Sequence, residues 1–323
     1  MKYVNYPFKD TKRLSFYLAT EEFLAKNYPK DEYFFMWQVN PSVIIGRNQL
    51  IDNEVNLKYV KEKNIELYRR KSGGGCVYAD FSNIMFSFIT PNFNKDFVFE
   101  TYLSRIVNIL KKLGLNAYFS GRNDILIDGL KVSGNAFYQV NSRSVVHGTM
   151  LYNTDLEEMI KAITPDNEKL ISKGINSVRK RVTNIREHLD ITIEDFKAFI
   201  KENIADEEIF LNESDINKII EIEKNYLTKQ FVFGKNPNYT LKKKGKVKAG
   251  LIEITLELKN NLIKKMNILG DYFIIKDEDE LVKCLINKEF DEKNLRSELE
   301  KIDIGDYIYN LTNDDFINVL FKQ

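Results

Sequence analysis

Three consecutive glycines, Gly73, Gly74 and Gly75, interrupt a basic stretch that reads RRKSGGGCVY. Because glycine has no Cβ, such a loop permits positive φ angles and lets backbone come close to a ligand. Arg70, just before the glycines, could bind a phosphate or a carboxylate through two parallel hydrogen bonds. The alternative interpretation is a sharp bend between two strands, with solvated basic side chains in front of it. A second group of polar residues is needed to decide between the two.

The loop does not match the common phosphate-binding loops. A Walker A loop continues with Lys and then Ser or Thr after its last glycine, whereas Gly75 is followed by Cys76 and Val77. A dinucleotide-binding fingerprint has a third glycine three residues further on, where a helix begins, and neither feature is present here. Any phosphate bound by this loop must be held in another way.

A second polar group lies in GRNDILIDGLKVSGNA, residues 121–136. Lys131 follows an Asp-Gly tight turn and precedes several small residues. A lysine held on a strand among small residues suits the stabilisation of charge on a reacting phosphate or carboxylate. A solvated lysine at a strand edge is the alternative, and the nearby Asn123 and Asp124 favour the functional interpretation.

Histidine and cysteine are scarce in this chain, which limits its chemistry. His147 begins HGTML at the end of a predicted strand, and because a lone histidine is most often structural, we place it in a pocket wall. Cys76 and Cys284 are far apart and form no metal-ligand spacing with the two histidines. A zinc site is therefore not expected.

Composition and charge argue against several further classes of protein. The 323 residues include 48 Lys and Arg against 47 Asp and Glu, so the net charge near zero does not predict a nucleic-acid-binding protein. No run of about 20 apolar residues could span a membrane, and residues 1–19 lack the pattern of a secretory leader. We expect a cytoplasmic protein with one large domain and one smaller domain.

Apolar periodicity and turn residues predict the elements that position these groups. A helix is predicted over residues 14–27, with its acids opposite the apolar side chains. Strand patterns at 33–40 and 43–49 are separated by Asn40-Pro41-Ser42, a hairpin-like turn signal. The further predicted elements are strands at 65–70 and 76–90 around the glycine loop, a helix at 97–114, a strand meander at 116–153, helices within 155–230, three strands after 240, and helices near 278–288 and 291–301.

Taken together, the motifs resemble those of the lipoate–protein ligases, within the biotin/lipoate ligase superfamily. The resemblance rests on VIIGRNQ, RRKSGGGCVY with Asp80 and Asn83, GRNDI with LKVSGNA, HGTMLYNTDL, and SKGINSVRKRVTNI, which occur in the family's order over nearly the whole chain. It implies an α/β (α+β) fold like that of class II synthetases and biotin ligases, with a mixed, mostly antiparallel sheet. Residues 1–240 would form the catalytic domain, and residues 241–323 a small C-terminal α/β accessory domain.

The resemblance also implies a reaction in two steps. Lipoate would attack the α-phosphate of ATP, with Mg²⁺, to give lipoyl-AMP, and a lysine of an apo lipoyl domain would then displace AMP. The implied acceptors are the glycine cleavage H protein and the E2 subunits of 2-oxoacid dehydrogenases, and we expect a cytoplasmic monomer without nucleic-acid or membrane partners. Phosphoryl chemistry of this kind depends on positioning and charge stabilisation rather than on a protein nucleophile.

The same resemblance assigns roles to individual residues. Lys131 would be catalytic and would contact the junction of carboxylate and phosphate in both steps. The ATP or adenylate site would consist of Arg70, Gly75, Cys76, Val77, Tyr78, Asn83, Asn123, Asp124, Lys131 and Thr149. The lipoate pocket would consist of Ser72, Gly74, Lys131, Ala136 and His147, and Asp124 is the candidate Mg²⁺ ligand.

Two positions depart from the pattern of the family. Ala79 stands where the family has histidine and Ser82 where it has glycine, so no role of that histidine is carried over. A basic rim is a candidate for recognising acidic lipoyl domains, the alternative being a solvated helix face. Its residues would be Lys173, Arg179, Lys180 and Arg181.

Four other activities are alternatives to the ligase. An octanoyl or lipoyl acyltransferase would need an activated cysteine after the lysine motif, where neither Cys76 nor Cys284 lies. A biotin ligase would carry a GRGRxG loop, which is absent. A non-catalytic binder of lipoyl domains and a transferase that uses lipoyl-AMP made elsewhere are the other two. The retention of Arg70, Asp124 and Lys131 argues against the non-catalytic binder.

Overall fold

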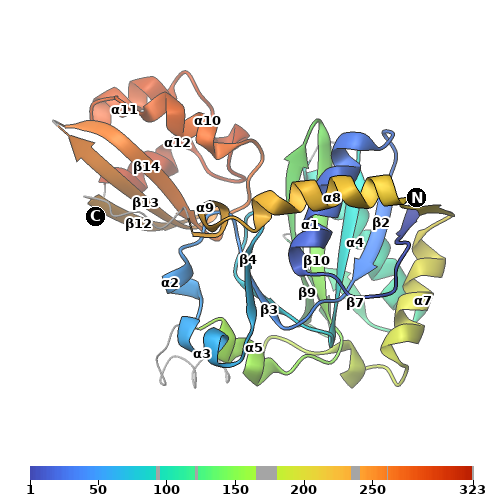
Figure 1. The fold of residues 1–323 in the computed structure, drawn as a ribbon. Helices are drawn as coiled ribbons and strands as arrows, with labels where there is room; N and C mark the ends of the chain where they lie inside the picture. The colour runs from blue at the N-terminus through green and yellow to red at the C-terminus, as the bar shows by residue number, and fades with distance from the viewer. Residues whose placement is uncertain (92–94, 121–122, 165–179, 234–240, 260, 322–323) are drawn as a thin grey trace.

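The computed structural model describes residues 1–91, 95–120, 123–164, 180–233, 241–259 and 261–321. Figure 1 shows two parts, a large one built around a central sheet and a smaller one formed by the residues after 240. No helix in the described ranges is both long enough and apolar enough to cross a membrane.

The large part contains an eight-stranded sheet with the strand order β11-β1-β2-β6-β10-β9-β8-β7. The strands are β1 (Lys2–Asn5), β2 (Tyr33–Trp37), β6 (Asn83–Thr90), β7 (Ala117–Phe119), β8 (Asp124–Ile127), β9 (Leu130–Val140), β10 (Arg143–Leu151) and β11 (Glu207–Phe210). The β11–β1 and β1–β2 pairs are parallel, and the other pairs of this sheet are antiparallel. The predicted mixed, mostly antiparallel sheet is confirmed, and so is the meander from β7 to β10.

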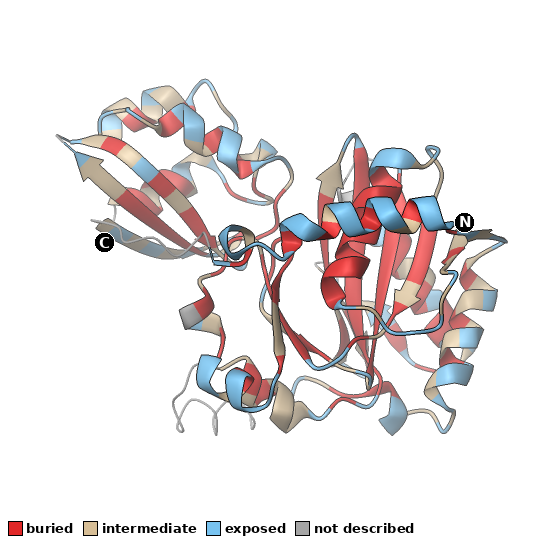
Figure 2. Ribbon diagram, viewed as in Figure 1, coloured by how far each residue is buried: buried red, intermediate tan, exposed pale blue. Residues whose placement is uncertain are grey.

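Helices cover both faces of this sheet. On one face lie α1 (Leu14–Asn27) and α8 (Glu213–Tyr226), and on the other lie α4 (Lys95–Lys112) and α7 (Ile193–Ile204). Figure 2 shows the strands between them buried along most of their length. The predicted helix 14–27 is confirmed, but the expectation for its acids is wrong. Glu21 and Glu22 are both buried, because α1 lies between the sheet and α8.

A second sheet, of three strands, carries the glycine loop. Its order is β4-β3-β5, and its strands are β3 (Ser42–Ile45), β4 (Glu66–Arg69) and β5 (Val77–Ala79). The glycine loop joins β4 to β5. The predicted hairpin at residues 40–42 is wrong, because β2 belongs to the large sheet whereas β3 pairs with β4 and β5.

The predicted strand 76–90 is in fact two strands, β5 and β6, which belong to different sheets. The chain turns between them at Asp80. The Oδ1 atom of Asp80 accepts hydrogen bonds from the backbone N–H of Ser82 at 2.8 Å and from the Ser82 hydroxyl. Ser82 therefore stabilises the turn through its own side chain, which gives the serine at this position a structural role.

Short helices and the edge strand β11 complete the large part. The helices are α2 (Ile51–Glu54), α3 (Leu57–Glu62), α5 (Leu156–Ala162), the 3-10 helix η1 (Ile185–Glu187) and α9 (Lys229–Phe233). The stretch 155–230 was expected to be helical, and α5, α7 and α8 agree with this. β11 contradicts it, because its residues pair in parallel with β1 at the edge of the sheet.

The small part has a hydrophobic core of its own. Its antiparallel strands are β12 (Leu241–Val247), β13 (Gly250–Lys259) and β14 (Leu262–Gly270), and its helices are α10 (Glu278–Leu285), α11 (Glu292–Leu299), the 3-10 helix η2 (Ile304–Asp306) and α12 (Asn313–Phe321). The three predicted strands and the two predicted helices are confirmed. α12 was not predicted.

The small part contacts the glycine loop directly. Gly74 N–H donates a hydrogen bond of 2.9 Å to the carbonyl of Tyr272, just after β14. Arg47 Nη2 lies 2.7 Å from Asp277 Oδ1, at the start of α10. The glycine loop therefore lies between the small sheet of the large part and residues 270–277 of the small part.

Candidate active site

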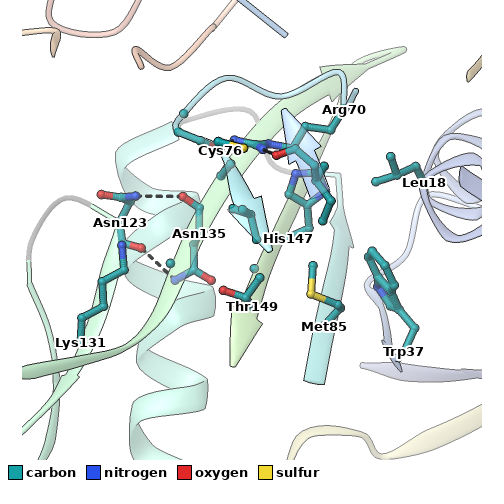
Figure 3. Close-up of a pocket in the computed structure, with 17 residues that line it drawn as sticks. Leu18, Trp37, Arg70, Cys76, Met85, Asn123, Lys131, Asn135, His147 and Thr149 are labelled. Carbon is teal, nitrogen blue, oxygen red and sulfur yellow. Dashed lines mark hydrogen bonds between the residues drawn. The ribbon is translucent and has the colours of Figure 1, made fainter. Parts of the chain in front are cut away.

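A pocket with about 620 Å³ of empty space, part of which is open solvent, lies between the glycine loop and strands β9 and β10. Figure 3 shows Leu18, Trp37 and Met85 on one side of it and Asn123 and Lys131 on the other. The remaining lining residues are Ile44, Arg70, Gly74, Gly75, Cys76, Val77, Gly134, Asn135, Ala136, His147, Gly148 and Thr149. The pocket thus has an apolar end and a polar end, which suits a molecule with an apolar chain and a charged head group.

Arg70 holds the glycine loop from inside. Its buried guanidinium donates hydrogen bonds to the carbonyls of Gly73 at 2.6 Å, Gly75 at 2.7 Å and Ile44 at 3.1 Å. It also donates to Ser72 Oγ at 2.9 Å. Burial lowers the pKa of Arg70 to about 10, so the group is still a cation at neutral pH. Most of its N–H donors thus serve the loop itself rather than an incoming anion.

The backbone of the loop needs glycine at two positions. Gly74 has a φ of +86°, a conformation that favours glycine. A Cβ on Gly73 would lie 2.1 Å from the carbonyl oxygen of Tyr272. A Cβ on Gly75 would meet nothing within 4 Å, and this residue lines the pocket. The space beside Gly75 is therefore open to a ligand.

A bulge in β9 brings Lys131 to the polar end of the pocket. The register between β8 and β9 shifts at this point, so one extra residue of β9 enters the pair, a device that redirects side chains. Lys131 Nζ lies 2.7 Å from Asp124 Oδ1. A Cβ on Gly134 would lie only 3.0 Å from the same Nζ, so the glycine leaves room for the ammonium.

Two asparagines form a hydrogen-bonded pair next to Lys131, marked by dashed lines in Figure 3. Asn135 Nδ2 donates to the backbone carbonyl of Asn123 at 2.8 Å. Asn123 Nδ2 donates to the backbone carbonyl of Asn135 at 3.1 Å. A Cβ on Gly148 would lie 1.9 Å from Asn135 Oδ1. The glycine of the HGT motif thus makes space for a neighbouring pocket residue.

His147 stands in the pocket wall and belongs to a buried polar network. Its Nε2 lies 2.6 Å from Ser72 Oγ, and its Nδ1 lies 2.9 Å from Glu21 Oε1. Glu21 also accepts hydrogen bonds from Ser87 at 2.5 Å and from Tyr138 at 3.1 Å. Glu21 itself is fully buried and does not line the pocket.

Comparison with known proteins places this geometry in a family. Residues 14–205 match the lipoyl protein ligase A/B catalytic domain, and residues 236–320 match the bacterial lipoate protein ligase C-terminus. The lipoate-protein ligase LplJ of Bacillus subtilis is 35% identical over 316 residues, which cover 94% of this chain and 96% of that protein. The chain belongs to the lipoate–protein ligase family. Lipoate–protein ligase 1 of Staphylococcus aureus is 37% identical over 312 residues, 94% of this chain and 95% of that protein.

Members of this ligase family with solved structures share the fold. The crystal structure of P. falciparum LipL1 in complex with lipoate has a TM-score of 0.77 and 25% identity, and the match covers 98% of this chain and 97% of that one. A bipartite ligase from Thermoplasma acidophilum, studied with its E2 lipoyl domain, has a TM-score of 0.67 and 25% identity over 74% of this chain and 98% of that one. Lipoate-protein ligase A bound with ATP has a TM-score of 0.61 and 23% identity over 72% of this chain and 98% of that one. As a member of this family, the chain is an enzyme of the ligase type.

The structure brings most of the predicted ligase residues together. Those that line the pocket are Arg70, Gly74, Gly75, Cys76, Val77, Asn123, Lys131, Ala136, His147 and Thr149. Four others do not line it. Ser72 is buried between Arg70 and His147, and Asp124 is connected to the pocket through Lys131. Tyr78 is buried in the core of the small sheet, and Asn83 is buried and accepts a hydrogen bond from the Thr154 hydroxyl.

The apolar end of the pocket and the buried acid beneath it were not predicted. Leu18, Trp37, Met85 and Glu21 carry no motif that separates them from ordinary core residues. The sequence signal that could have identified Glu21 is a charged residue within an otherwise apolar helix, but Glu22 shows the same signal and does not line the pocket either.

The segment after residue 179 pairs with Lys131. Lys131 N–H donates to the Arg181 carbonyl at 2.8 Å, and Thr183 N–H donates to the Lys131 carbonyl at 3.0 Å. Two of the four rim candidates, Lys180 and Arg181, are exposed in this segment. Lys173 and Arg179 lie outside the described residues. The pairing places one rim candidate next to the predicted catalytic lysine.

Neither cysteine supports a thioester mechanism, and Ala79 has no reactive side chain. Cys76 lines the pocket, but burial raises the pKa of its thiol to about 12, so the thiol is protonated at neutral pH. Cys284 is exposed on α10 of the small part. Ala79 is fully buried and pairs with Ser42 of β3. The cysteine thioester mechanism of an acyltransferase has no support in this geometry.

Asp124 was the candidate Mg²⁺ ligand, and its surroundings bear on that candidate. The described part of the chain holds no cluster of three or more His, Cys, Asp and Glu side chains able to bind a metal alone. Mg²⁺ is commonly bound by one or two carboxylates together with substrate phosphates, and it keeps several waters. A single carboxylate next to Lys131, which itself lines the polar end of the pocket, is compatible with this mode of binding.

Proposed function

We propose that this protein binds lipoic acid and ATP in this pocket, joins them as lipoyl-AMP, and transfers the lipoyl group to a lysine of an apo lipoyl domain. The observation that carries the proposal is a pocket whose apolar end, with Trp37, lies opposite a polar end with Lys131. Related proteins with lipoate and with ATP bound support it. The apolar end would hold the dithiolane and alkyl chain, and the polar end the reacting carboxylate and phosphate.

In the first step, a carboxylate oxygen of lipoate attacks the α-phosphorus of ATP. The bond from that phosphorus to the bridging oxygen breaks, and pyrophosphate leaves with that oxygen. The pocket residues act by positioning the two substrates, because no protein nucleophile is required. The Lys131 ammonium exchanges part of its contact with Asp124 for the substrate oxygens and stabilises the negative charge on them.

In the second step, the amine of an acceptor lysine attacks the carbonyl carbon of lipoyl-AMP. A C–N bond forms, the bond from the carbonyl carbon to the phosphate oxygen breaks, AMP leaves, and the attacking nitrogen loses a proton. Lys131 lies where it can stabilise the departing phosphate as well. One lysine thus serves both steps, because the carboxylate oxygen that bonds to the phosphorus in the first step is the oxygen that leaves with AMP in the second.

We assign the remaining residues by their position in the pocket. Gly75, Cys76, Val77, Asn123 and Thr149 would contact ATP or the adenylate, and Gly74, Ala136 and His147 would contact lipoate. Arg70 would act by holding the loop, with Ser72 behind it, while Tyr78 and Asn83 would support the strands from the core. Mg²⁺, held by Asp124 with the nucleotide phosphates, would supply charge neutralisation.

We further propose a catalytic domain of residues 1–240 and an accessory domain of residues 241–323. The separate sheets and hydrophobic cores support this division. Acceptors would be the glycine cleavage H protein and E2 subunits, a proposal supported by the related ligase studied with an E2 lipoyl domain. The exposed side chains of Lys180 and Arg181 would belong to the acceptor rim. We expect a cytoplasmic monomer.

The decisive experiment combines the protein with ATP, Mg²⁺, lipoate and an apo lipoyl domain. Pyrophosphate release and the mass of the acceptor are followed together. We expect pyrophosphate release to require both ATP and lipoate, and the acceptor to gain one lipoyl group. Acceptor modification without ATP would contradict the ligase proposal and would indicate an acyltransferase instead. Modification only when lipoyl-AMP is added would show a transferase that depends on adenylate made elsewhere.

A further inference from the structure

A continuous chain of hydrogen bonds runs beneath the pocket from the apolar end to the glycine loop. Trp37 Nε1 donates to Ser87 Oγ at 3.0 Å, and Ser87 donates to Glu21 Oε1 at 2.5 Å. Glu21 Oε1 lies 2.9 Å from His147 Nδ1. His147 Nε2 lies 2.6 Å from Ser72 Oγ, which in turn accepts from Arg70 Nε at 2.9 Å. Figure 3 shows Trp37 and Arg70, the two ends of this chain, on separate parts of the pocket wall.

The donors at its two ends and the carboxylate at its centre determine the direction of most bonds in this chain of hydrogen bonds. The indole of Trp37 and the guanidinium of Arg70 can only donate, and a carboxylate can only accept. Ser87 therefore accepts from the indole and donates to Glu21. Ser72 accepts from the guanidinium, and Nδ1 of His147 carries a proton because the carboxylate that it faces can only accept. Glu21 Oε1 thus stands at the centre of the chain of hydrogen bonds and is shared by Ser87 and His147.

The burial of the Glu21 carboxylate needs an explanation. It is fully buried on α1, and it is hydrogen-bonded to the side chains of Ser87, Tyr138 and His147. Burying an ionised carboxylate is costly even when hydrogen bonds compensate, and apolar residues in its place are often as stabilising. The ordinary alternative is a polar core network that specifies the fold. That alternative does not account for the two ends of the chain, which are both pocket residues.

We propose that Glu21 is a positioning residue for both ends of the pocket. Through Ser87 it fixes the indole of Trp37, which bounds the acyl end. Through His147 and Ser72 it fixes Arg70, which holds the carbonyls of Gly73 and Gly75 and so sets the shape of the loop at the nucleotide end. This inference rests on the proposed function for the identity of the two substrates.

Three substitutions separate the two arms of the chain. Ser87→Ala cuts the arm to Trp37, Ser72→Ala cuts the arm to Arg70, and Glu21→Gln replaces one accepting oxygen at the centre by an N–H donor. The matched control is Glu223→Gln. Glu223 is also a buried glutamate that accepts a serine hydroxyl, from Ser15 at 2.6 Å, and it does not line the pocket.

Two constants are measured in parallel for each variant. The dissociation constant for lipoate is obtained from the fluorescence of Trp37, the single tryptophan of the chain. The KM for ATP is obtained from lipoate-dependent exchange of pyrophosphate into ATP. We expect Ser87→Ala to weaken lipoate binding about tenfold and to shift the Trp37 emission, with KM for ATP changed less than about twofold. We expect Ser72→Ala to raise the KM for ATP by a larger factor than the dissociation constant for lipoate, Glu21→Gln to change both constants, and the Glu223→Gln control to change neither.

Hydrogen exchange of the amides in residues 70–78 provides a readout that does not depend on catalysis. We expect faster exchange there in Ser72→Ala and in Glu21→Gln, and wild-type exchange in Ser87→Ala and in the control. If the wild type shows no lipoate-dependent exchange of pyrophosphate, the proposed function fails. The amide hydrogen exchange of residues 70–78 and the Trp37 emission still test the chain of hydrogen bonds in that case. The proposal would be contradicted by equal changes in both constants for the two serine variants, or by wild-type amide exchange of residues 70–78 in Glu21→Gln. The hydrogen bonds would then be an ordinary polar network of the core.

Discussion

Lys131 Nζ and Asp124 Oδ1 lie 2.7 Å apart, on adjacent strands whose register shifts by one residue between them. The pair is partly exposed, and under the proposed function a substrate anion would take the place of the carboxylate at the ammonium. Both residues therefore belong to one small electrostatic unit, although they were assigned different roles from the sequence. The predictions for the two residues must be tested separately.

Replacement of Lys131 by Met should abolish most of the adenylation activity and leave the fold intact. Loss of a group that stabilises transition-state charge typically lowers kcat by about 10²–10³-fold. The measurement is lipoate-dependent exchange of pyrophosphate into ATP, with circular dichroism as a check on folding. Near-normal turnover in Lys131→Met would show that the central residue of the mechanism has been assigned wrongly.

Replacement of Asp124 by Asn separates its two possible roles. If Asp124 binds Mg²⁺ with the nucleotide, the Mg²⁺ concentration that gives half-maximal activity should rise by about tenfold or more, since loss of a group that supports a metal commonly costs that much affinity. We expect this result. A lower kcat with an unchanged Mg²⁺ dependence would instead assign Asp124 to the orientation of Lys131 alone.

Replacement of Gly134 by Ala tests whether the position of the ammonium matters. The added Cβ would lie 3.0 Å from Lys131 Nζ and 3.1 Å from Cε, so the flexible lysine must move. We expect little change in the free energy of unfolding but a decrease of about tenfold to a hundredfold in adenylation, the typical effect of a misplaced catalytic group. In the Lys131→Met background the same substitution should have almost no further effect. Equal losses in both backgrounds would contradict this explanation.

The elements with regular periodicity could be predicted from the sequence, but the choice of partner for each strand could not. The helix 14–27 and the strands after residue 240 follow from local pattern alone. The hairpin at residues 40–42 was wrong because a turn signal does not determine which sheet the next strand joins. β11 was missed because its sequence, EEIF, has two acids and lies at an exposed sheet edge.

The site could be predicted only in part, for a related reason. Glycine and lysine motifs marked the polar end because close backbone approach and a charged group among small residues are unusual in any context. Trp37 and Met85 look like core residues, and the sequence contains nothing to show that they line a pocket. Arg70 was identified from the sequence, but its contacts were not. The carbonyls of Gly73 and Gly75 come within reach of its guanidinium only when the loop is folded.

The contact between the two parts at the glycine loop leads to a further prediction. A Cβ on Gly73 would lie 2.1 Å from the carbonyl oxygen of Tyr272, the acceptor of the Gly74 N–H hydrogen bond. Gly73→Ala should therefore disturb the packing of residues 270–277 on the loop, measured as faster amide exchange in both segments, and should lower adenylation. Gly75→Ala is the matched control for the interface, since a Cβ there meets nothing within 4 Å. Equal disturbance of residues 270–277 by both variants would contradict the prediction.

Glu22 gives the protein a defined dependence of stability on pH. Its carboxylate accepts hydrogen bonds from Lys26 at 2.5 Å, Lys71 at 2.6 Å and the hydroxyl of Tyr226 at 3.1 Å. Burial by itself would raise the pKa of Glu22, but Lys71 and Lys26 lower it below the ordinary value of 4.5. The ionised form is thus favoured by folding. Its stabilisation is complete above the ordinary pKa and is lost as the pH falls through the lowered pKa of the folded state.

Glu22→Gln should accordingly lower the free energy of unfolding by about 1–2 kcal/mol at neutral pH, because a buried carboxylate with charged partners is lost. The difference from the wild type should shrink below about pH 4.5 and vanish at lower pH, where the wild-type carboxylate is itself protonated. Urea denaturation across this range measures it. The control is Glu221→Gln, whose carboxylate pairs with Lys224 at 2.6 Å on the exposed face of α8. Such an exposed pair should contribute less than about 1 kcal/mol at any pH. A difference for Glu22→Gln that persists undiminished in acid would show that packing, and not charge, accounts for the effect.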